Sequence, residues 1–382
     1  MTSQPMLIAV EATRLQREVR GIGRYVRAIL PRLVAQRPGL QLVLFAKTRG
    51  GVTALAESMS RDPQLCGNVT VRHVREMART PADLHWFPWN VIGPVPRSGA
   101  SVVTVHDIAP VAMPDPRWLA WRKNLRWRMR FRRSARMATL LLADSAFTAA
   151  EIQRMLGVGA DRIRVALLAA DDFAMTSSAD DSGALERLGV RAPYVLAVGA
   201  AEKRKNHGLL ERAMRSVVAA HPGTTLVLAG PRRRTSAPSP DTVWMQTLGF
   251  VSDAELTALY RNAAALVMPS TYEGFGLPVL EAMRLGTPVI CARASSLPEV
   301  AGDAALWVKP DDHAELAAAI SSVLDDRTLR AALSAGSLRQ ARTFSWDDTA
   351  RNTLNAFDEA HELYRLAQLA GAPASQMISA TA

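Results

Sequence analysis

The chain has 382 residues, of which 48% are hydrophobic and 21% charged, and this length predicts two domains that each bury a sizeable core. No apolar run approaches the ~20 residues of a membrane span, and the N-terminus has no basic start, so neither a membrane span nor a signal peptide is expected. Cys66 and Cys291 have no metal-ligand or redox spacing, which favours a reducing cytoplasm.

The net charge of +11 lies entirely in the first half of the chain. Residues 1–181 contain 26 Lys and Arg against 15 Asp and Glu, whereas residues 182–382 contain 20 of each. A half with such an excess of cations is drawn to polyanions or to an anionic membrane surface. We therefore expect the first half of the chain to face one of these.

The first half begins with alternating strand and helix signals. Leu7–Val10 is a buried-strand run, and a loop through Gly21 and Gly23 leads to a helix and then to a strand at Leu40–Phe45. Together they predict a βαβ unit, although the glycines do not complete a dinucleotide-binding fingerprint. Gly21 and Gly23 remain candidate site residues, with a simple turn as an equally good interpretation.

Two further strands are predicted at Leu84–Asn90 and Val102–Asp107, with polar residues where they end. Open α/β sheets bind ligands at the carboxyl edge of their strands, so His106 and Asp107 are expected on that rim. A histidine there either contacts a ligand or makes structural hydrogen bonds. Trp86 either stacks on a ligand or packs inside the domain.

A basic helix is predicted over Arg117–Arg136, which holds nine Lys or Arg and no acid. On a helical wheel one apolar stripe consists of Trp118, Trp121, Leu125 and Met129. A basic amphipathic helix with tryptophans is typical of a membrane-surface element, but the favoured interpretation is a stripe packed on the sheet with solvated arginines. The helix can pack on the sheet and also contact a membrane if Trp127 and Phe131 are exposed and touch lipid headgroups. A strand at Leu140–Ala143 then leads to Asp144 and Ser145, a good N-cap for the next helix.

The second half follows a linker rich in Asp, Ser and Ala at 171–183, which predicts domains over residues 1–172 and 184–345. A strand at Tyr194–Val198 is followed by Arg204 and Lys205, directly before a helix. Two cations beside a helix N-terminus oppose the helix dipole. The pair is therefore better explained as a clamp for a diphosphate, with bidentate contact from the arginine and a point charge from the lysine.

The most informative stretch is 269–288, which reads PSTYEGFGLPVLEAMRLGTP. It predicts the end of a strand, a glycine-rich turn and an amphipathic helix. Unpaired amides at a helix start attract anions, and glycines let a ligand approach the backbone closely. We therefore expect a diphosphate or a sugar to bind at four consecutive residues, Gly274, Phe275, Gly276 and Leu277.

Two glutamates bracket this turn. Glu273 precedes the helix, and Glu281 lies eight residues further along, about a turn into it. Carboxylates beside an anion are costly unless they accept hydrogen bonds from hydroxyls. Two acids around an amide-rich turn therefore suit a ligand with both hydroxyls and phosphates, which describes a nucleotide sugar.

These residues resemble the signature of glycosyltransferase family 4, retaining enzymes of the GT-B fold, whose mark is two glutamates separated by seven residues around a GFGLP-like turn. Two further segments agree with it, VGAAEKRKN at 198–206 and SSLPEVAGDAA at 295–305. The likeness to the mannosyltransferase-like branch covers most of the chain. It implies an α/β protein of GT-B type, with two Rossmann-like doubly wound domains facing across a cleft and a C-terminal helix at 346–369 returning to the first domain.

The resemblance also implies roles for the candidate residues. Glu273 would orient the donor sugar, Glu281 would hold the ribose, and His106 would touch the sugar from the acceptor-side domain. Some members carry an arginine where this chain has Ala200, so the clamp on the leaving diphosphate would rest on Arg204 and Lys205. Donor contacts are also expected from Phe250, in the segment that wraps the nucleobase, and from the cleft-lining Gly21 and Gly23; acceptor contacts are expected from Asp107, Trp86 and Asn90.

The expected reaction is transfer of a hexose with retention of configuration. No nucleophile is evident, so front-face return assisted by the leaving phosphate is expected in place of a covalent intermediate. No Asp-x-Asp cluster is present, so neither a metal nor another cofactor is expected. The favoured donor is GDP-mannose, with UDP- or dTDP-sugars as alternatives, and the favoured acceptor is a glycan or lipid-linked oligosaccharide; nucleic acid is not expected as a partner.

Two other functions stay open from the sequence. One is a non-catalytic basic GT-B module that binds an anionic polymer, and the other is a GT-B nucleotide-sugar epimerase, which needs no acceptor. A cytoplasmic protein, peripheral on the inner face of the membrane if the basic helix binds lipid, is the expected location.

Overall fold

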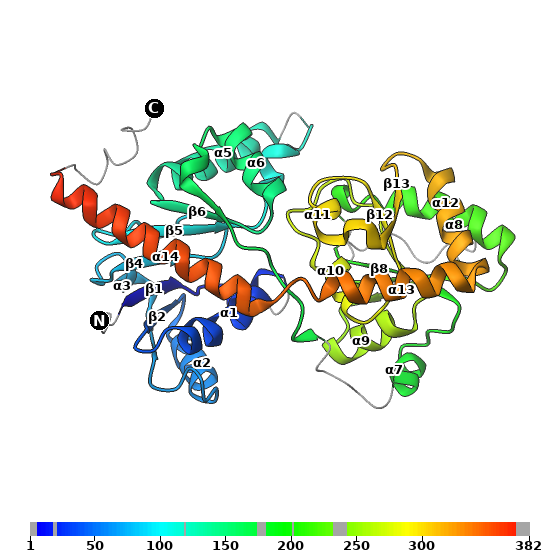
Figure 1. Ribbon diagram of the computed structural model, residues 1–382, viewed down its shortest axis with the longest axis horizontal. Helices are drawn as coiled ribbons and strands as arrows, with labels where there is room; N and C mark the ends of the chain where they lie inside the picture. Colours follow the sequence, from blue (N-terminus) through cyan, green and yellow to red (C-terminus); the bar gives the residue numbers. More distant parts are fainter. Residues whose placement is uncertain are drawn as a thin grey trace. The chain divides into compact units, whose positions relative to one another are not determined.

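The computed structural model describes residues 6–17, 21–117, 120–173, 181–200, 202–231 and 243–371. The chain divides into two compact units: unit 1 comprises residues 1–168 and 346–382, and unit 2 comprises residues 169–345. Figure 1 labels most of their helices and strands. Each unit is built on one sheet whose paired strands all run parallel.

Unit 1 contains a seven-stranded sheet in the order β3-β2-β1-β4-β5-β6-β7. Its strands are β1 (Leu7–Glu11), β2 (Gln41–Ala46), β3 (Val69–His73), β4 (Leu84–Phe87), β5 (Ala100–Val105), β6 (Leu140–Ala143) and β7 (Ile163–Val165). Its α-helices are α1 (Ile22–Gln36), α2 (Arg49–Ser60), α3 (Val74–Met77), α4 (Ala109–Ala112), α5 (Trp121–Met137), α6 (Ala146–Leu156) and α14 (Trp346–Leu369). The strand order reverses between β1 and β4, where doubly wound sheets place their ligands.

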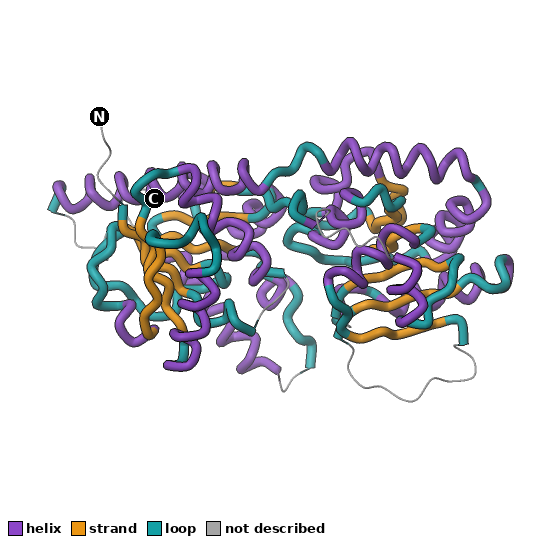
Figure 2. The backbone as a smooth tube through the Cα atoms, turned by 90° about the horizontal axis from the view of Figure 1, so that it is seen from below, coloured by secondary structure: helices purple, strands orange, loops and turns teal. Residues whose placement is uncertain are grey.

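Helices cover both faces of this sheet, as the tube in Figure 2 shows. On one face α1 and α14 pack together, and Trp86 of β4 meets Tyr25 of α1 and Phe357 of α14 at ring-centroid distances of 6.0 and 5.5 Å. On the other face Phe131 of α5 packs in the core cluster that includes Phe87 of β4. Successive side chains of β4 point to opposite faces of the sheet, so Trp86 packs against α1 and α14 while Phe87 packs on the side of α5.

The basic helix is α5, and the favoured prediction for its apolar stripe is wrong. Phe131 is 1% exposed and Trp127 packs partly buried against the core, whereas Trp121, Leu125 and Met129 are exposed. The helical positions that continue the stripe beyond Met129 are Arg132 and Arg136, and burying these cations is costly. Ser134 and Ala135 instead continue the stripe of Phe131, and their small side chains let α5 approach the sheet. Trp118, also assigned to the stripe, lies outside the described residues.

Unit 2 contains a six-stranded sheet in the order β10-β9-β8-β11-β12-β13. Its strands are β8 (Tyr194–Val198), β9 (Thr225–Ala229), β10 (Met245–Gly249), β11 (Ala265–Met268), β12 (Val289–Ala292) and β13 (Ala305–Val308). Its α-helices are α7 (Asp181–Arg187), α8 (His207–Ala220), α9 (Asp253–Asn262), α10 (Leu277–Arg284), α11 (Leu297–Ala301), α12 (His313–Asp325) and α13 (Arg327–Ala341). Here the order reverses between β8 and β11, so the carboxyl ends of these two strands form the expected ligand edge.

Short helical turns complete both units: η2 (Ala160–Arg162) in unit 1, and η4 (Lys203–Lys205) and η6 (Gly302–Ala304) in unit 2. Helix α7 begins at Asp181, inside the segment expected to be a linker, of which residues 174–180 lie outside the described part. Among the residues that the structure describes, none of the helices combines the length and the apolar character needed to cross a membrane.

Candidate functional site

Two loops of unit 2 meet at the edge where the strand order reverses. Strands β8 and β11 are neighbours in the sheet, so the loop after Val198 lies beside the loop after Met268. The backbone N–H of Thr271 donates to the carbonyl of Arg204 at 2.8 Å, and Asn206 donates to the carbonyl of Pro269 at 3.2 Å. The topology therefore brings the cationic pair and the glutamate turn together from segments almost 70 residues apart.

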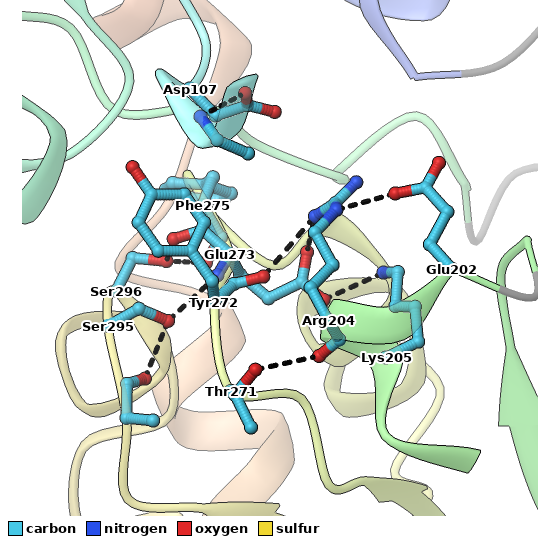
Figure 3. Close-up of polar contacts among 12 residues, drawn as sticks. Asp107, Glu202, Arg204, Lys205, Thr271, Tyr272, Glu273, Phe275, Ser295 and Ser296 are labelled. Carbon is cyan, nitrogen blue, oxygen red and sulfur yellow. Dashed lines mark hydrogen bonds and ion pairs between the residues drawn. The ribbon is translucent and has the colours of Figure 1, made fainter. Parts of the chain in front are cut away.

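Glu273 is held by both predicted cations, as Figure 3 shows. Its Oε2 lies 3.0 Å from Arg204 Nη1, and its Oε1 lies 2.8 Å from Lys205 Nζ. Arg204 also donates from Nε to Glu202 at 2.6 Å. Glu273 is 5% exposed and Lys205 8%, so the cations compensate a carboxylate that burial alone would disfavour.

The charge state of Glu273 follows from these contacts. Burial opposes its ionisation, but the charges of Lys205 and Arg204 outweigh burial and hold the pKa of the carboxyl below its usual range. Glu273 is therefore an anion at neutral pH, locked between two cations. Chemically, this arrangement presents fixed positive charge next to a group that accepts hydrogen bonds.

Two serines hold the turn that carries Glu273. The hydroxyl oxygen of Ser295 accepts the N–H of Glu273 at 2.9 Å. The hydroxyl of Ser296, which is fully buried, donates to the carbonyls of Glu273 at 3.0 Å and Phe275 at 2.6 Å. Both serines directly precede α11, so the segment after β12 fixes the turn after β11.

Glycines permit two close approaches in this site. Gly276 has φ +113° and precedes the first residue of α10; a Cβ there would lie 2.9 Å from Leu297 Cδ2. Gly199 has φ +129°, and a Cβ there would lie 3.1 Å from Cε of Lys205. Because Gly199 has no side chain, the side chain of Lys205 can lie against the backbone at the start of the loop that follows β8.

The remaining donor-side candidates lie in the same unit. Glu281, on α10, is 8% exposed, and its Oε2 accepts the hydroxyl of Tyr260 at 3.0 Å. Phe250, directly after β10, is 65% exposed. The structure thus places one predicted acid within the cation cluster and the other in a hydrogen bond to a tyrosine of α9.

Unit 1 forms its own polar cluster where β5 and β6 end. His106 is buried, with Nδ1 2.6 Å from Oδ2 of Asp144 and Nε2 2.9 Å from the carbonyl of Pro88. Burial lowers the pKa of His106, but the charge and hydrogen bond of Asp144 outweigh it and raise the pKa above the usual range. Both ring nitrogens face acceptors, so a hydrogen bond from the ring to a sugar hydroxyl requires one of these contacts to be released.

The other candidates in unit 1 surround this cluster. Asn90 has φ +69°, and its side-chain oxygen accepts the backbone N–H of His106 at 2.6 Å. Asp107 accepts the N–H of Ala109 at 3.0 Å. Trp86 is fully buried and donates its indole N–H to Thr104, so packing, not stacking on a ligand, explains it. At α1, Gly21 is the N-cap with φ +58°, and Gly23 is buried within the helix.

Comparison with known proteins identifies the family. Residues 186–339 match the family model described as glycosyl transferases group 1. Over 374 residues the chain is 33% identical to the O-antigen chain mannosyltransferase B of Escherichia coli, covering 88% of this chain and 95% of that protein. The chain belongs to the group 1 glycosyl transferases. A shorter match, 41% identical over 120 residues, links this transferase to the MMP alpha-(1->4)-mannosyltransferase of Mycolicibacterium hassiacum and covers 30% of this chain and 29% of that protein.

Solved structures show that the transferase has the GT-B fold. Sucrose-phosphate synthase from Thermosynechococcus elongatus superposes with a TM-score of 0.64 at 20% identity, covering 96% of this chain and all of that one. Anabaena Alr3699/HepE, solved in complex with UDP-glucose, superposes with a TM-score of 0.67 at 19% identity, covering 93% of this chain and all of that one. The predicted fold class is confirmed.

Sequence analysis did not predict these contacts for four residues that organise the transferase's polar clusters, although two of them, Ser295 and Ser296, lie in the quoted segment 295–305; the four are Asp144, Tyr260, Ser295 and Ser296. Asp144 was assigned only to the cap of α6, yet the adjacency of β5 and β6 at one sheet edge was a usable signal for its pairing with His106. The contacts of Tyr260 and the two serines span about 20 residues and involve no charged pattern that a sequence displays.

Proposed function

We propose that this glycosyltransferase moves a hexose from a nucleotide sugar to a surface polysaccharide or its lipid-linked precursor, with mannose from GDP-mannose as the favoured donor. The names of the mannosyltransferase relatives support the sugar and the acceptor class. The observation that carries the proposal is the cluster of Arg204, Lys205 and Glu273 beside the start of α10. This cluster places two cations, which can bind the oxygens of a diphosphate, next to a carboxylate, which can accept hydrogen bonds from sugar hydroxyls.

Departure of the diphosphate is the step that this cluster is proposed to assist. A guanidinium has five N–H donors and an ammonium has three, so Arg204 and Lys205 have the capacity to bind phosphate oxygens while they hold Glu273. Donors fixed before the reaction stabilise developing charge without reorganisation. Positive charge supplied in this way by side chains and by the N-terminus of α10 supports a reaction that proceeds without a metal.

Glu273 and Glu281 are proposed to bind the donor through hydroxyls. Because Glu273 is ionised, it can accept sugar hydroxyls and stabilise positive charge that develops on the ring. Glu281 is proposed to take ribose hydroxyls, oriented by its bond from Tyr260. Departure and attack on the same face, assisted by the leaving phosphate, give the retaining outcome proposed here. His106 and Asp107 remain proposed substrate contacts of unit 1.

Purified protein incubated with GDP-mannose, UDP-glucose and dTDP-glucose tests the proposal through nucleotide release. Release that increases when a glycan acceptor is added distinguishes a transferase from an epimerase or a binding module. Lys205→Gln is expected to lower turnover on the order of 100-fold, the scale measured for loss of one preorganised donor. The exposed neighbour Lys203 in the same turn supplies the control, because Lys203→Gln is expected to change turnover less than about twofold.

Because both cations contact Glu273, a variant that lacks Arg204 and Lys205 together is a poor test of the clamp. Removing Arg204 and Lys205 together would leave a buried carboxylate without compensation, which costs about 3–5 kcal/mol, so single variants are the sharper test. Normal turnover in a folded Lys205→Gln protein would contradict the proposed clamp. Mass spectrometry of nucleotide that copurifies with the protein identifies the base independently.

A further inference from the structure

Helix α5 leaves an apolar stripe exposed on the surface of unit 1. Trp121, Leu125 and Met129 follow one another at four-residue spacing and are 54%, 48% and 61% exposed. The same helix packs on the sheet through another face, where Phe131 is buried and Trp127 is partly buried. The exposed stripe is therefore not a surface that α5 needs for folding.

A groove of about 790 Å³ follows this stripe, and the described residues that line it all belong to α5. Its apolar part comes from Trp121, Leu125, Met129 and Met137, and long arginine side chains complete it. The guanidinium of Arg122 lies 5.3 Å from the centroid of the Trp121 ring, so cation and aromatic ring are presented together.

The charge of α5 is of one sign. Its 17 residues include eight Lys or Arg, all exposed, and no Asp or Glu. These eight account for most of the excess of cations in residues 1–181, where 26 Lys and Arg stand against 15 acids. Within the described parts of the chain, no carboxylate forms an ion pair with a cation of α5.

We propose that this face of α5 docks on an anionic phospholipid surface. An amphipathic helix of this kind lies in the plane of the membrane interface, with its apolar side chains among the acyl chains and its cations at the headgroups. Tryptophan prefers this interface, and arginines reach the headgroups by extending along their apolar stems. A single weak signal gives only marginal attachment, and α5 supplies two, an apolar stripe and a basic flank.

Charge complementarity favours this occupant over the others. A duplex nucleic acid would pair with the arginines, but it would leave the aliphatic side chains of Leu125 and Met129 without an apolar partner. A second copy of the chain would bring eight cations of α5 against eight like charges, which is unfavourable. An anionic bilayer is the partner that matches both parts of the surface.

The inference goes beyond the proposed sugar transfer, because vesicle binding requires neither donor nor acceptor. A lipid-linked acceptor would be concentrated at the same surface, so docking would increase encounter with it. Failure of docking leaves the transfer proposal intact, and absence of transfer leaves docking testable.

Cosedimentation of the full chain with vesicles is the experiment. Vesicles of phosphatidylcholine alone are compared with vesicles that also contain phosphatidylglycerol, each at low and at high salt. We expect binding only to the anionic vesicles, weakened by salt because exposed charges are screened. Replacing three flanking arginines together, Arg122→Gln, Arg126→Gln and Arg133→Gln, is expected to weaken the partition coefficient on the order of 100-fold.

The apolar part is tested by Trp121→Ser, Leu125→Ser and Met129→Ser in one protein, expected to weaken partition at least about tenfold. The matched control replaces exposed leucines of α14, with Leu363→Ser, Leu366→Ser and Leu369→Ser, and is expected to change partition less than about twofold. Circular dichroism and the rate of nucleotide release verify that each variant is folded.

Three outcomes overturn the proposal. The first is equal binding to neutral and anionic vesicles, and the second is unchanged partition after loss of the stripe. The third is a gel shift of duplex DNA that depends on the arginines, ignores the stripe and occurs without vesicle binding. That last result would assign the face to a polyanion in solution.

Discussion

Ser296 allows a sharp test of how the turn around Glu273 is positioned. Its buried hydroxyl donates to the carbonyls of Glu273 at 3.0 Å and Phe275 at 2.6 Å. Ser296→Ala removes that donor from two buried carbonyls, and loss of one partner of a buried hydrogen bond costs about 1–3 kcal/mol. Because two acceptors share this donor, we expect a loss of about 2 kcal/mol in the free energy of unfolding.

Unit 2 offers a matched control at Ser337. Its hydroxyl is also fully buried and donates to a carbonyl, that of Thr287, at 3.2 Å, but in a different place in the unit. Ser337→Ala is expected to lose about 1 kcal/mol of stability and to keep its kinetics. Ser296→Ala is expected to lower kcat/KM by roughly 10- to 100-fold, because small misplacements of a catalytic group cost this much.

Urea unfolding and nucleotide release from the preferred donor measure the two effects. Stability and turnover are read on the same preparations, so a turnover loss caused by unfolding is recognised directly. If both alanine variants lose stability while both keep the parental kcat/KM, Ser296 has no positioning role and the reasoning is refuted.

Two further predictions concern the polar clusters of Glu273 and His106, and a third concerns the close approach at Gly276. The pKa of the Glu273 carboxyl is lower in the folded protein than in the unfolded chain. Its contribution to the free energy of unfolding is therefore fully present above the unfolded-state pKa and is lost as the pH falls through the folded-state pKa. Glu273→Gln should flatten the acid limb of a curve of stability against pH. The pKa of the His106 ring is higher in the folded protein than in the unfolded chain. Its contribution to the free energy of unfolding is therefore fully present below the unfolded-state pKa and is lost as the pH rises through the folded-state pKa. His106→Gln should remove this loss of stability with rising pH, measured by urea unfolding. Gly276→Ala places a Cβ 2.9 Å from Leu297 at φ +113° and should destabilise the protein by about 1–3 kcal/mol and weaken nucleotide binding, measured by calorimetry; unchanged affinity would contradict the role given to this turn.

Strands buried on both faces were the most predictable elements. The apolar runs Leu140–Ala143 and Tyr194–Val198 coincide with β6 and β8, because central strands of a parallel sheet are continuous apolar segments with abrupt ends. The edge strands β3 and β10 were not predicted. Each is only partly buried and carries polar residues along its length, so neither shows the continuous apolar run that marks the central strands.

The cation cluster was predictable in composition but not in geometry. Spacing placed Arg204, Lys205 and Glu273 near helix starts, and parallel topology then brought their loops together. Their direct pairing was not foreseen, because the sequence assigned the cations to a diphosphate and the acid to a sugar. The buried face of α5 was predicted wrongly because the helical wheel was read as one apolar stripe, Trp118 to Met129. The structure buries Phe131, Ser134 and Ala135 on another face instead.

The pairing changes what Glu273 is expected to contribute. An exposed arginine or lysine loses roughly 2 kcal/mol of rotamer entropy when it is immobilised on a ligand. Lys205 is already buried against Glu273, so in the proposed reaction this ordering would be complete before a diphosphate binds. The same carboxylate neutralises part of the positive charge, which in that reaction would weaken the attraction for the ground-state diphosphate. As negative charge on the leaving group grows, the fixed cations interact with it more strongly, and this difference between ground state and transition state is what accelerates a reaction.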